Sequence, residues 1–424
     1  MSDSPPTSEQ PNIFVLAQQH LAKQGITVDP ESVPDPDTMS MLDVVETKNG
    51  IRVKPHLNNI RLILTHDPRW KGKIRYNELR GQAEIRGQAV TDTHETMIAC
   101  RLPYIYGLKA TEKAISSILR LVASENRFHP VVDYLDALEW DGKPRVDHLL
   151  SRYFGAADSD LNRILSRRFL ISAIARARKM GSKVDCVLIL IGPQGARKSS
   201  GLRALCGDEW FADTVLSLSS KDGLESLRGV WIYELAELDS LKKAEMSRTK
   251  AYLAAQVDHY RASYGRNPED RPRGCVFVGS TNEAQFLTDP TGHRRYWCCK
   301  VGSIDLDSID TDRDQLWAEA DTYYRGGEQW WLSPAEEALR VNAAEEHEVV
   351  DPWRETISEF LTPRLHPVTM SEVLDHLDLD SARRTMGASR RVGAILRQLG
   401  REKARERRNG IRVKVWARTT KGDR

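Results

Sequence analysis

The chain has 424 residues, of which 40% are hydrophobic and 29% charged, and its formal net charge is +2. This length predicts two or three domains, and the composition excludes a disordered or fibrous protein. The sequence shows no apolar run of membrane-spanning length and no signal-peptide core, so we expect a cytoplasmic protein with no membrane partner. The six cysteines include no C-x-x-C pair, which indicates reduced thiols and no zinc site.

The first part of the chain divides into two regions. Residues 1–40 are polar and rich in proline, with one short amphipathic pattern, so we expect a disordered segment with a short helix. Residues 41–128 predict a small mixed α+β domain, with strands at Gly50–Lys54 and Ile74–Asn77 and a helix at Ala110–Ala123. Its scattered basic residues favour a solvated surface over contact with a nucleic-acid backbone, and it shows no acidic triad for primase chemistry.

Residues 129–180 predict a helical adaptor region. A turn at Trp140–Pro144 separates two helical patterns, and Leu161–Met180 has the length and the apolar spacing of a long helix. That helix leads directly into a buried strand, so we expect the adaptor to precede the core domain, residues 181–335.

A buried strand, a glycine-containing loop and a helix follow one another in the sequence VLILIGPQGARKSS, which begins at Val187. This order is typical of a phosphate-binding loop, whose backbone N–H groups and helix N-terminus attract phosphate. Lys198 would then contact the β- and γ-phosphates of ATP, and the Ser199 hydroxyl would ligate Mg²⁺. The other candidates for nucleotide binding are Gly192, Pro193, Gln194, Gly195, Ala196, Arg197 and Ser200. The alternative, a strand and helix with a chance lysine, is less favoured.

The loop departs from the usual pattern at one position. The pattern is G-x-x-x-x-G-K-[ST], and Arg197 stands where the second glycine is expected, while Gly195 lies two residues earlier. Either the loop accepts a side chain there or its grip on the phosphates is altered. Arg197 itself is a candidate for contact with a phosphate or with a neighbouring subunit.

An apolar strand that runs into acidic residues follows at Gly229–Asp239, with the sequence GVWIYELAELD. A Walker B motif has this form, because one carboxylate holds Mg²⁺ and a second polarises the attacking water. We assign the metal to Glu234 and the water to Glu237, and the reverse assignment stays open. The alternative is a strand end with solvated acids, which is less favoured at this distance after a phosphate-binding loop.

Two further stretches follow the acidic strand. Asp258–Arg273 is dense in arginine and carries Tyr260 and Tyr264. It predicts, with equal weight, a basic hairpin that tracks DNA phosphates and stacks on bases, or a charged surface loop. A buried strand at Gly274–Asn282 ends in an amide. In P-loop ATPases an asparagine at this place senses the γ-phosphate, so Asn282 is a catalytic candidate.

Arg294 and Arg295 precede the last strand predicted in this region. An arginine supplied across a subunit boundary stabilises charge in the transition state of phosphoryl transfer. We therefore add both arginines to the catalytic candidates, as fingers that act on a neighbouring subunit.

Residues 352–424 have a charge pattern of their own. Between residues 381 and 424 the chain carries 15 lysine and arginine residues against 3 aspartate and glutamate residues. The periodicity predicts three helices and a final strand, at Pro352–Leu361, Ser371–Leu379, Arg391–Gly400 and Gly410–Trp416. This order resembles a winged helix that binds duplex DNA. The alternative is a basic tail that aids solubility or assembly.

Five segments, in order, are GPQGARKSS, GVWIYELAELDSL, VDHYRASYGR, CVFVGSTNEAQFLTDPTGHRRYW and RDQLWAEADTYY. Over roughly residues 129–332 this series resembles the virulence-associated protein E family, ATPases of phage and genomic-island replication that are similar to superfamily 3 DNA helicases of the AAA+ class. The resemblance implies an α/β fold with an αβα P-loop NTPase core, ATP and Mg²⁺ as cofactors, and a hexameric ring with single-stranded DNA in its channel. Many members carry an N-terminal primase module. This chain is short for one, so a separate primase is a candidate partner.

Three functions are compatible with these patterns. We expect an ATP-driven DNA helicase or translocase of a mobile element such as a prophage. The alternative is a DNA-binding replication initiator that uses ATP as an assembly switch with little turnover. A small-molecule kinase is less favoured, because no acceptor site is evident and the C-terminal region is basic.

Overall fold

The computed structural model divides the chain into two compact units. The first comprises residues 1–284 and 291–344, and the second comprises residues 285–290 and 345–424. The structure describes residues 32–48, 50–214, 221–235, 252–260, 268–282, 295–344, 352–364, 366–379, 383–408 and 411–418. The short amphipathic helix expected at Ile13–Lys23, together with Glu237, Tyr264 and Arg294, lies outside these ranges.

The first unit begins with a small α+β region. Its described elements are α2 (Pro36–Met41), β1 (Val44–Thr47), β2 (Gly50–Val53), α3 (Leu57–His66), β3 (Ile74–Asn77), β4 (Gln82–Ile85), β5 (Gln88–Ala89), α4 (Asp92–Tyr106), α5 (Glu112–Glu125) and β6 (Arg127–Phe128). The strands β5, β4, β3 and β6 form one sheet in that order, and β1 pairs only with β2 among the described strands. Helix α5 packs on β3 and β4, because Ile115, Leu119 and Val122 lie on one helical face and are buried. The predicted strands and helix of this region are confirmed.

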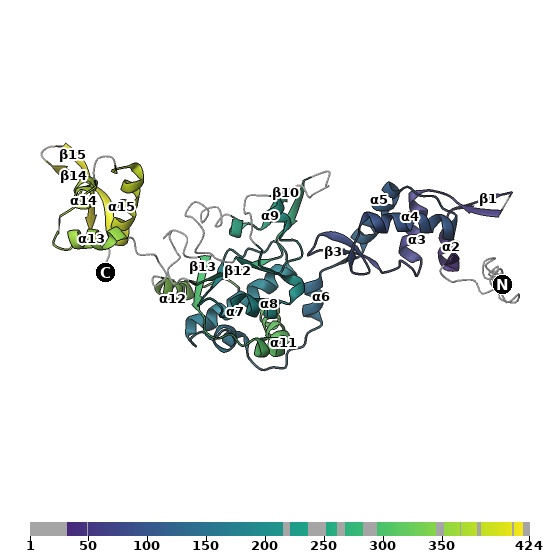
Figure 1. Ribbon diagram of the computed structural model, residues 1–424, viewed down its shortest axis with the longest axis horizontal. Coiled ribbons are helices and arrows are strands. Elements are labelled where there is room, and N and C mark those ends of the chain that lie inside the picture. The colour runs from purple at the N-terminus through teal and green to yellow at the C-terminus, as the bar shows by residue number, and fades with distance from the viewer. Residues whose placement is uncertain are drawn as a thin grey trace, which may run out of the picture. The chain divides into compact units, whose positions relative to one another are not determined.

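The adaptor region is helical, with one difference from the prediction. Helix α6 (Pro130–Asp136) precedes the turn, but the second helical pattern forms a 3-10 turn (Val146–His148) and a π-helical turn (Leu149–Tyr153). The predicted long helix is α7 (Asp160–Arg178), and every residue from Phe169 to Ala177 is buried. A helix buried on all sides lies inside a core, which matches its place beneath the central sheet in Figure 1.

A parallel five-stranded sheet forms the centre of the first unit, with the order β13-β7-β12-β9-β8. Its strands are β7 (Val187–Ile191), β8 (Phe211–Ala212), β9 (Ile232–Leu235), β12 (Val276–Thr281) and β13 (Tyr296–Lys300). All five residues of β7 and all six of β12 are buried, as expected for strands covered on both faces. The mixed α/β architecture with a parallel sheet is therefore confirmed.

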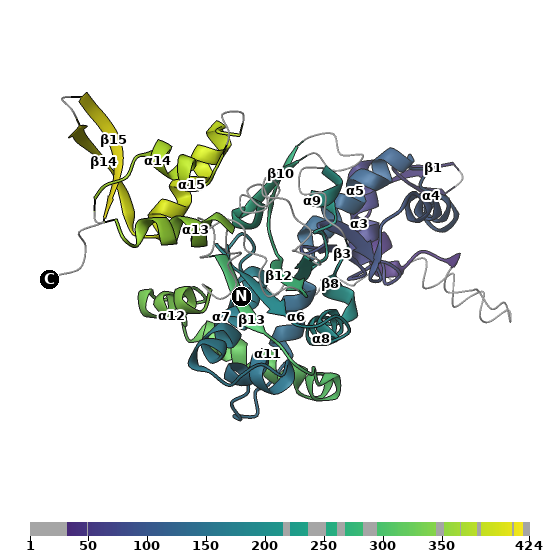
Figure 2. The same ribbon diagram turned by 60° about the vertical axis from the view of Figure 1, so that its left-hand side comes forward.

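Helices α7, α8 (Lys198–Cys206) and α11 (Leu306–Arg325) pack on the sheet face that carries Leu188 and Leu190. Figure 2 shows them gathered around the sheet. Two tryptophans fix this layer. Trp231 and Trp317 are fully buried with ring centroids 4.2 Å apart, and each indole N–H donates to a helix carbonyl, of Ala173 and Leu205 respectively.

The remaining described elements of the first unit are a 3-10 turn (Asp208–Trp210), α9 (Lys221–Glu225), a hairpin of β10 (Val257–Tyr260) and β11 (Glu269–Pro272), and α12 (Pro334–Ala344). The turn after β3 joins the α+β region to this core. Leu79 lies in the core cluster, and its carbonyl accepts hydrogen bonds from the Gly229 N–H and from Arg271. Among the described residues, no helix has both the length and the apolar content needed to cross a membrane.

The second unit has its own hydrophobic core. Its described elements are α13 (Pro352–Leu361), α14 (Met370–His376), α15 (Met386–Gln398), β14 (Arg401–Arg408) and β15 (Ile411–Arg418). The two strands pair antiparallel along their whole length, and Val368 forms an isolated bridge with Trp416. Helix α15 begins five residues earlier than predicted, because the Thr385 hydroxyl accepts from the Ala388 N–H and caps it. Strand β14 was not predicted.

Candidate functional site

The loop between β7 and α8 depends on a close backbone approach at its start. The Gly192 N–H donates to the Thr281 carbonyl of the neighbouring strand β12. A Cβ atom at Gly192 would lie 3.0 Å from the Val301 carbonyl oxygen, so a side chain there would crowd the backbone. Gly195 then turns the chain with a φ of +82°, a conformation that glycine adopts without strain.

Arg197 occupies the N-cap of α8 in the left-handed conformation, with φ 62° and ψ 30°. This is a conformation that glycine adopts freely and that costs other residues about 1–2 kcal/mol. The loop thus accepts a side chain where the sequence pattern expects glycine. The Arg197 side chain is exposed rather than folded into the loop.

Lys198 and Asn282 come together at the end of the loop. The buried Lys198 ammonium donates to the carbonyls of Gly192 and Pro193, at 2.7 and 3.1 Å, and to the Asn282 side-chain oxygen at 3.0 Å. These partners hold the charge under the loop, at the N-terminus of α8, where the backbone N–H groups also favour an anion.

Ser199 and Glu234 form a second pair beside the first. The Ser199 hydroxyl donates to Oε1 of Glu234 at 2.9 Å. Glu234 is fully buried, and within the described part of the chain its Oε2 has no hydrogen-bond partner. Burial raises the pKa of the Glu234 carboxyl, and the hydroxyls of Ser280 and Ser199 offset part of that effect. The Ser199 hydroxyl and the Glu234 carboxylate are oxygen ligands, which Mg²⁺ prefers, and the unsatisfied Oε2 leaves one carboxylate oxygen for the metal.

The order of the strands explains why these four side chains meet. Strand β12 lies between β7 and β9, parallel to both, with Thr281 opposite Ile191 and Gly279 opposite Leu235. The carboxyl ends of all three strands therefore share one edge of the sheet. Asn282 follows β12, so it lies between the loop on one side and the acidic strand on the other.

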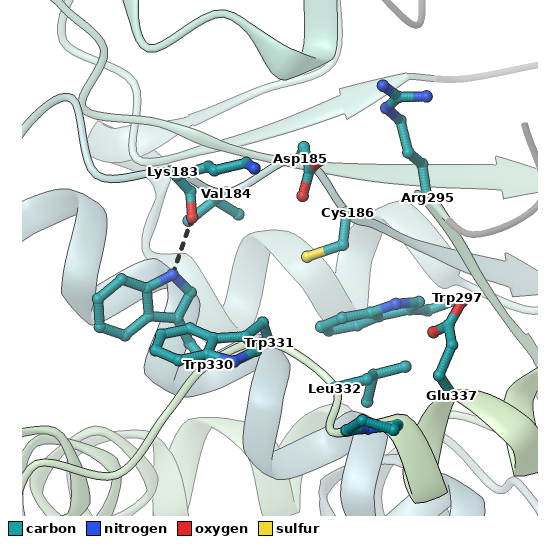
Figure 3. A pocket seen from close by; sticks show the side chains of 11 residues that line it. Lys183, Val184, Asp185, Cys186, Arg295, Trp297, Trp330, Trp331, Leu332 and Glu337 are labelled. Carbon is teal, nitrogen blue, oxygen red and sulfur yellow. Dashed lines mark hydrogen bonds between the residues drawn. The ribbon is translucent and has the colours of Figure 1, made fainter.

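Arg295 lies at the opposite edge of the same sheet. It precedes Tyr296, which pairs with Val187 at the start of β7. The five residues of β7 span about 16 Å, so Arg295 does not contact the loop of its own chain. Instead it lines a cavity of about 700 Å³ with Trp297, Trp331 and other residues (Figure 3). Arg294 lies outside the described residues.

The base of the β10–β11 hairpin contradicts part of one hypothesis. Tyr260 is buried and its hydroxyl accepts a hydrogen bond from Arg228 at 2.7 Å, so it does not stack on bases. Arg273 is buried in an ion pair with Asp258, and Arg271 donates to the carbonyl groups of Glu78 and Leu79. Arg273 is buried and Arg271 is half-buried, and through these contacts both side chains serve the fold. The part of the hairpin between residues 261 and 267 lies outside the described residues.

Sequence reasoning missed Ser280, whose hydroxyl lowers the pKa of Glu234 against the effect of burial. The signal was a run of small polar residues, Ser280 to Asn282, at the end of an otherwise apolar strand. Of the remaining candidates, Pro193, Gln194 and Ser200 are exposed, and Ala196 is half-buried. Among the described residues no group of three or more His, Cys, Asp or Glu side chains is placed to hold a metal ion.

Solved structures show only weak likenesses to this chain. The chain is similar to the apo structure of the NrS-1 C-terminal region, at 11% identity over 81% of this chain and 95% of that one, with a TM-score of 0.44. It is also similar to a mutant of RuvB from Thermotoga maritima, at 12% identity over 61% and 92%, with a TM-score of 0.23. At these scores neither likeness carries an inference. No curated protein matches the chain.

A family model, in contrast, matches a continuous range of the chain. The model of the virulence-associated protein E-like domain matches residues 135–349, slightly more than half of the chain. This range contains the loop, the acidic strand and the strand that precedes Asn282, and it confirms the resemblance found in the sequence. The chain therefore belongs to the family that carries the virulence-associated protein E-like domain.

Proposed function

We propose that this chain is an ATP- and Mg²⁺-dependent DNA helicase or translocase that acts in the replication of a phage or genomic island. The observation that carries the proposal is the convergence of Lys198, Asn282, Ser199 and Glu234 at one edge of the parallel sheet. The strand, loop and helix around them support a P-loop NTPase core of the AAA+ or superfamily 3 type. The family match supports the setting in mobile-element replication.

Each side chain has contacts that suit a task in phosphoryl transfer. Lys198 would exchange the carbonyls of Gly192 and Pro193 for oxygens of the β- and γ-phosphates, while Asn282 stays beside the same ammonium. Ser199 and Glu234 would hold Mg²⁺, which when bound neutralises charge on the phosphates. Glu237 would accept a proton from the attacking water.

The second unit supports a contact with duplex DNA. Its elements follow the order helix, bridged segment, two helices and a β-hairpin, which fits a winged helix. On the hairpin, Arg405 lies opposite Lys414 and Arg407 lies opposite Arg412, and all four side chains are exposed. Like charges directly opposite one another destabilise an antiparallel pair, so a phosphate backbone would relieve a cost that the free hairpin bears.

Arg295 supports assembly into a ring. Since it lies at the sheet edge away from its own loop, it can serve a nucleotide only on another copy of the chain. A head-to-tail interface of this kind is heterologous and closes into a ring, for which we propose six subunits around a single strand of DNA. We propose that Arg294 acts together with Arg295 on the nucleotide of the neighbouring subunit.

The test is ATP hydrolysis by the full chain with and without single-stranded DNA, followed by unwinding of a forked duplex. Stimulated hydrolysis with unwinding supports a helicase. Stimulated hydrolysis without unwinding supports a translocase. ATP binding and DNA binding without turnover would replace the proposal with the initiator that uses ATP as an assembly switch.

A further inference from the structure

The N-terminus of α8 has an unusual N-cap residue. This residue is Arg197, and no side-chain hydrogen bond caps the helix. Serine, threonine, aspartate or asparagine is preferred at this place, because a side-chain oxygen accepts from the N–H groups that a helix leaves free. A guanidinium has no acceptor to offer. The first turn of α8 therefore presents its N–H groups to an acceptor from outside the helix, and an anion suits them best.

The surroundings of the Arg197 guanidinium do not explain its presence. The side chain is exposed, and within the described ranges no hydrogen bond, ion pair or aromatic ring engages it. The backbone does not explain it either, because the left-handed conformation of Arg197 suits glycine better than arginine. Neither the packing of the core nor the geometry of the loop requires an arginine at this position.

A buried oxygen beside the same helix points independently to a ligand. Glu234 is fully buried, and among the described residues its Oε2 has no hydrogen-bond partner. Its Oε1 accepts from the hydroxyl of Ser199, two residues after Arg197. The start of α8 therefore brings together free N–H groups, an exposed cation and a carboxylate that suits a metal ion. This combination fits a phosphate that arrives with Mg²⁺.

Arg197 and its neighbour Lys198 offer their charges from different surroundings. The Lys198 ammonium is buried beneath the loop, where it donates to the carbonyls of Gly192 and Pro193. The Arg197 guanidinium lies in solvent. A phosphate chain on the N–H groups of the loop would have Lys198 on its protein side and Arg197 on its solvent side. The planar fork of the guanidinium also matches two oxygens of a phosphate, which an ammonium does not.

We propose that Arg197 binds the phosphate chain of the nucleotide in its own subunit, as a second cation beside Lys198. This inference rests on the proposed function, because it assumes that the loop binds ATP. It gives the departure from the loop pattern a role: the arginine strengthens the grip on the phosphates at a cost to the backbone. Restoring the glycine of the pattern should therefore relax the loop and weaken the binding of ATP.

The test is a titration of the full chain with Mg²⁺ and ATP, for the parent, Arg197→Gly and Arg197→Lys. Arg197→Gly should lower the affinity about tenfold, because a charge-assisted hydrogen bond to phosphate is lost. Arg197→Lys should recover part of this loss, since the charge remains and the fork does not. Without nucleotide, the unfolding midpoint of Arg197→Gly should equal or exceed that of the parent, because glycine accepts the left-handed backbone. Weaker binding then cannot be attributed to a damaged fold.

Arg86 provides a matched control. It is another exposed arginine with a left-handed backbone, at φ 53°, in the turn between β4 and β5. Arg86→Gly removes the same charge and relieves the backbone in the same way, but away from the loop. The affinity for ATP should stay at the parental value. A loss equal to that of Arg197→Gly would show a general effect of charge and would overturn the proposal.

Two further outcomes would also contradict it. An affinity for ATP in Arg197→Gly that equals or exceeds the parental value would remove Arg197 from the phosphate site. If turnover alone falls in Arg197→Gly and returns on mixing with Lys198→Ala, the guanidinium acts on a neighbouring subunit instead. A parent chain that does not bind ATP would refute the proposed function itself, so the two failures are distinguishable.

Discussion

At the scale of single residues, Glu234 is the most informative side chain. Its carboxyl is fully buried, and burial raises its pKa above the ordinary value. At pH values between the pKa of Glu234 in the unfolded chain and its higher pKa in the folded chain, the folded chain binds more protons than the unfolded chain. Stability therefore falls as the pH rises through that interval, and at neutral pH the nucleotide-free fold bears the cost of a buried carboxylate.

This cost can be measured with Glu234→Gln in the absence of nucleotide. The variant cannot ionise, so its unfolding midpoint should exceed that of the parent at pH 7.5, and the gap should narrow as the pH falls toward 5. Glu46→Gln, at an exposed position on β1, serves as the control. Equal midpoints for Glu234→Gln and the parent at every pH would show that the carboxyl is not destabilised by its surroundings.

The two acids of the Walker B segment should differ in their effects. Glu237→Gln should bind ATP and hydrolyse it poorly, because the attacking water loses its base. Glu234→Gln should lose the dependence of ATP binding on Mg²⁺. Titrations with and without Mg²⁺, with turnover assays, distinguish the two. Trapping of ATP by Glu234→Gln and not by Glu237→Gln would exchange their roles.

The residues of the loop were predictable because their spacing along the chain is itself the signal. Lys198 and Ser199 come after one buried strand and its loop, and Asn282 directly follows another buried strand. The left-handed backbone of Arg197 was not predictable, since the pattern shows only that a glycine is missing. The place of Arg295 could not be foreseen either, because it depends on which strand β13 pairs with.

At the scale of elements, the hairpin of the second unit explains what sequence patterns can miss. Strand β15 alternates apolar and basic residues and was predicted, whereas β14 has the sequence REKARERR and no apolar alternation. Pairing with β15 makes it a strand. The dipeptide Asn409-Gly410 between the two is a strong hairpin signal in the sequence. Helices α13, α14 and α15 were predicted because their apolar spacing is local.

The charges of this hairpin give a prediction about DNA. Arg405→Gln with Arg407→Gln should weaken duplex binding and flatten the slope of log affinity against log salt by about 0.9 for each phosphate that is no longer neutralised. Glu402→Gln changes a side chain on the other face of the same strand and should not weaken binding. Fluorescence anisotropy at several salt concentrations provides the measurement. An unchanged slope in the double variant would place the duplex contact elsewhere, first of all at residues 261–267.

At the scale of the whole molecule, the position of Arg295 predicts cooperation between copies. Arg294→Ala with Arg295→Ala should keep ATP binding and lose turnover, on the order of 10³-fold if these arginines act as fingers. A Lys198→Ala chain keeps its arginines and lacks a working loop. A mixture of the two variants should form some complete sites and recover part of the activity. If mixed rings form and remain as inactive as either variant alone, the arginines do not act between subunits.

The most direct measurement of the central claim is Mg²⁺-dependent ATP binding by the parent chain and by Lys198→Ala. The lysine is buried and bonded to Gly192, Pro193 and Asn282, so its loss removes the cation of the proposed phosphate site. Affinity should fall about 10- to 100-fold and turnover should cease, while Lys179→Ala, a change of an exposed lysine at the end of α7, should match the parent. A Lys198→Ala chain that binds and hydrolyses ATP as the parent does would contradict the assignment of the site.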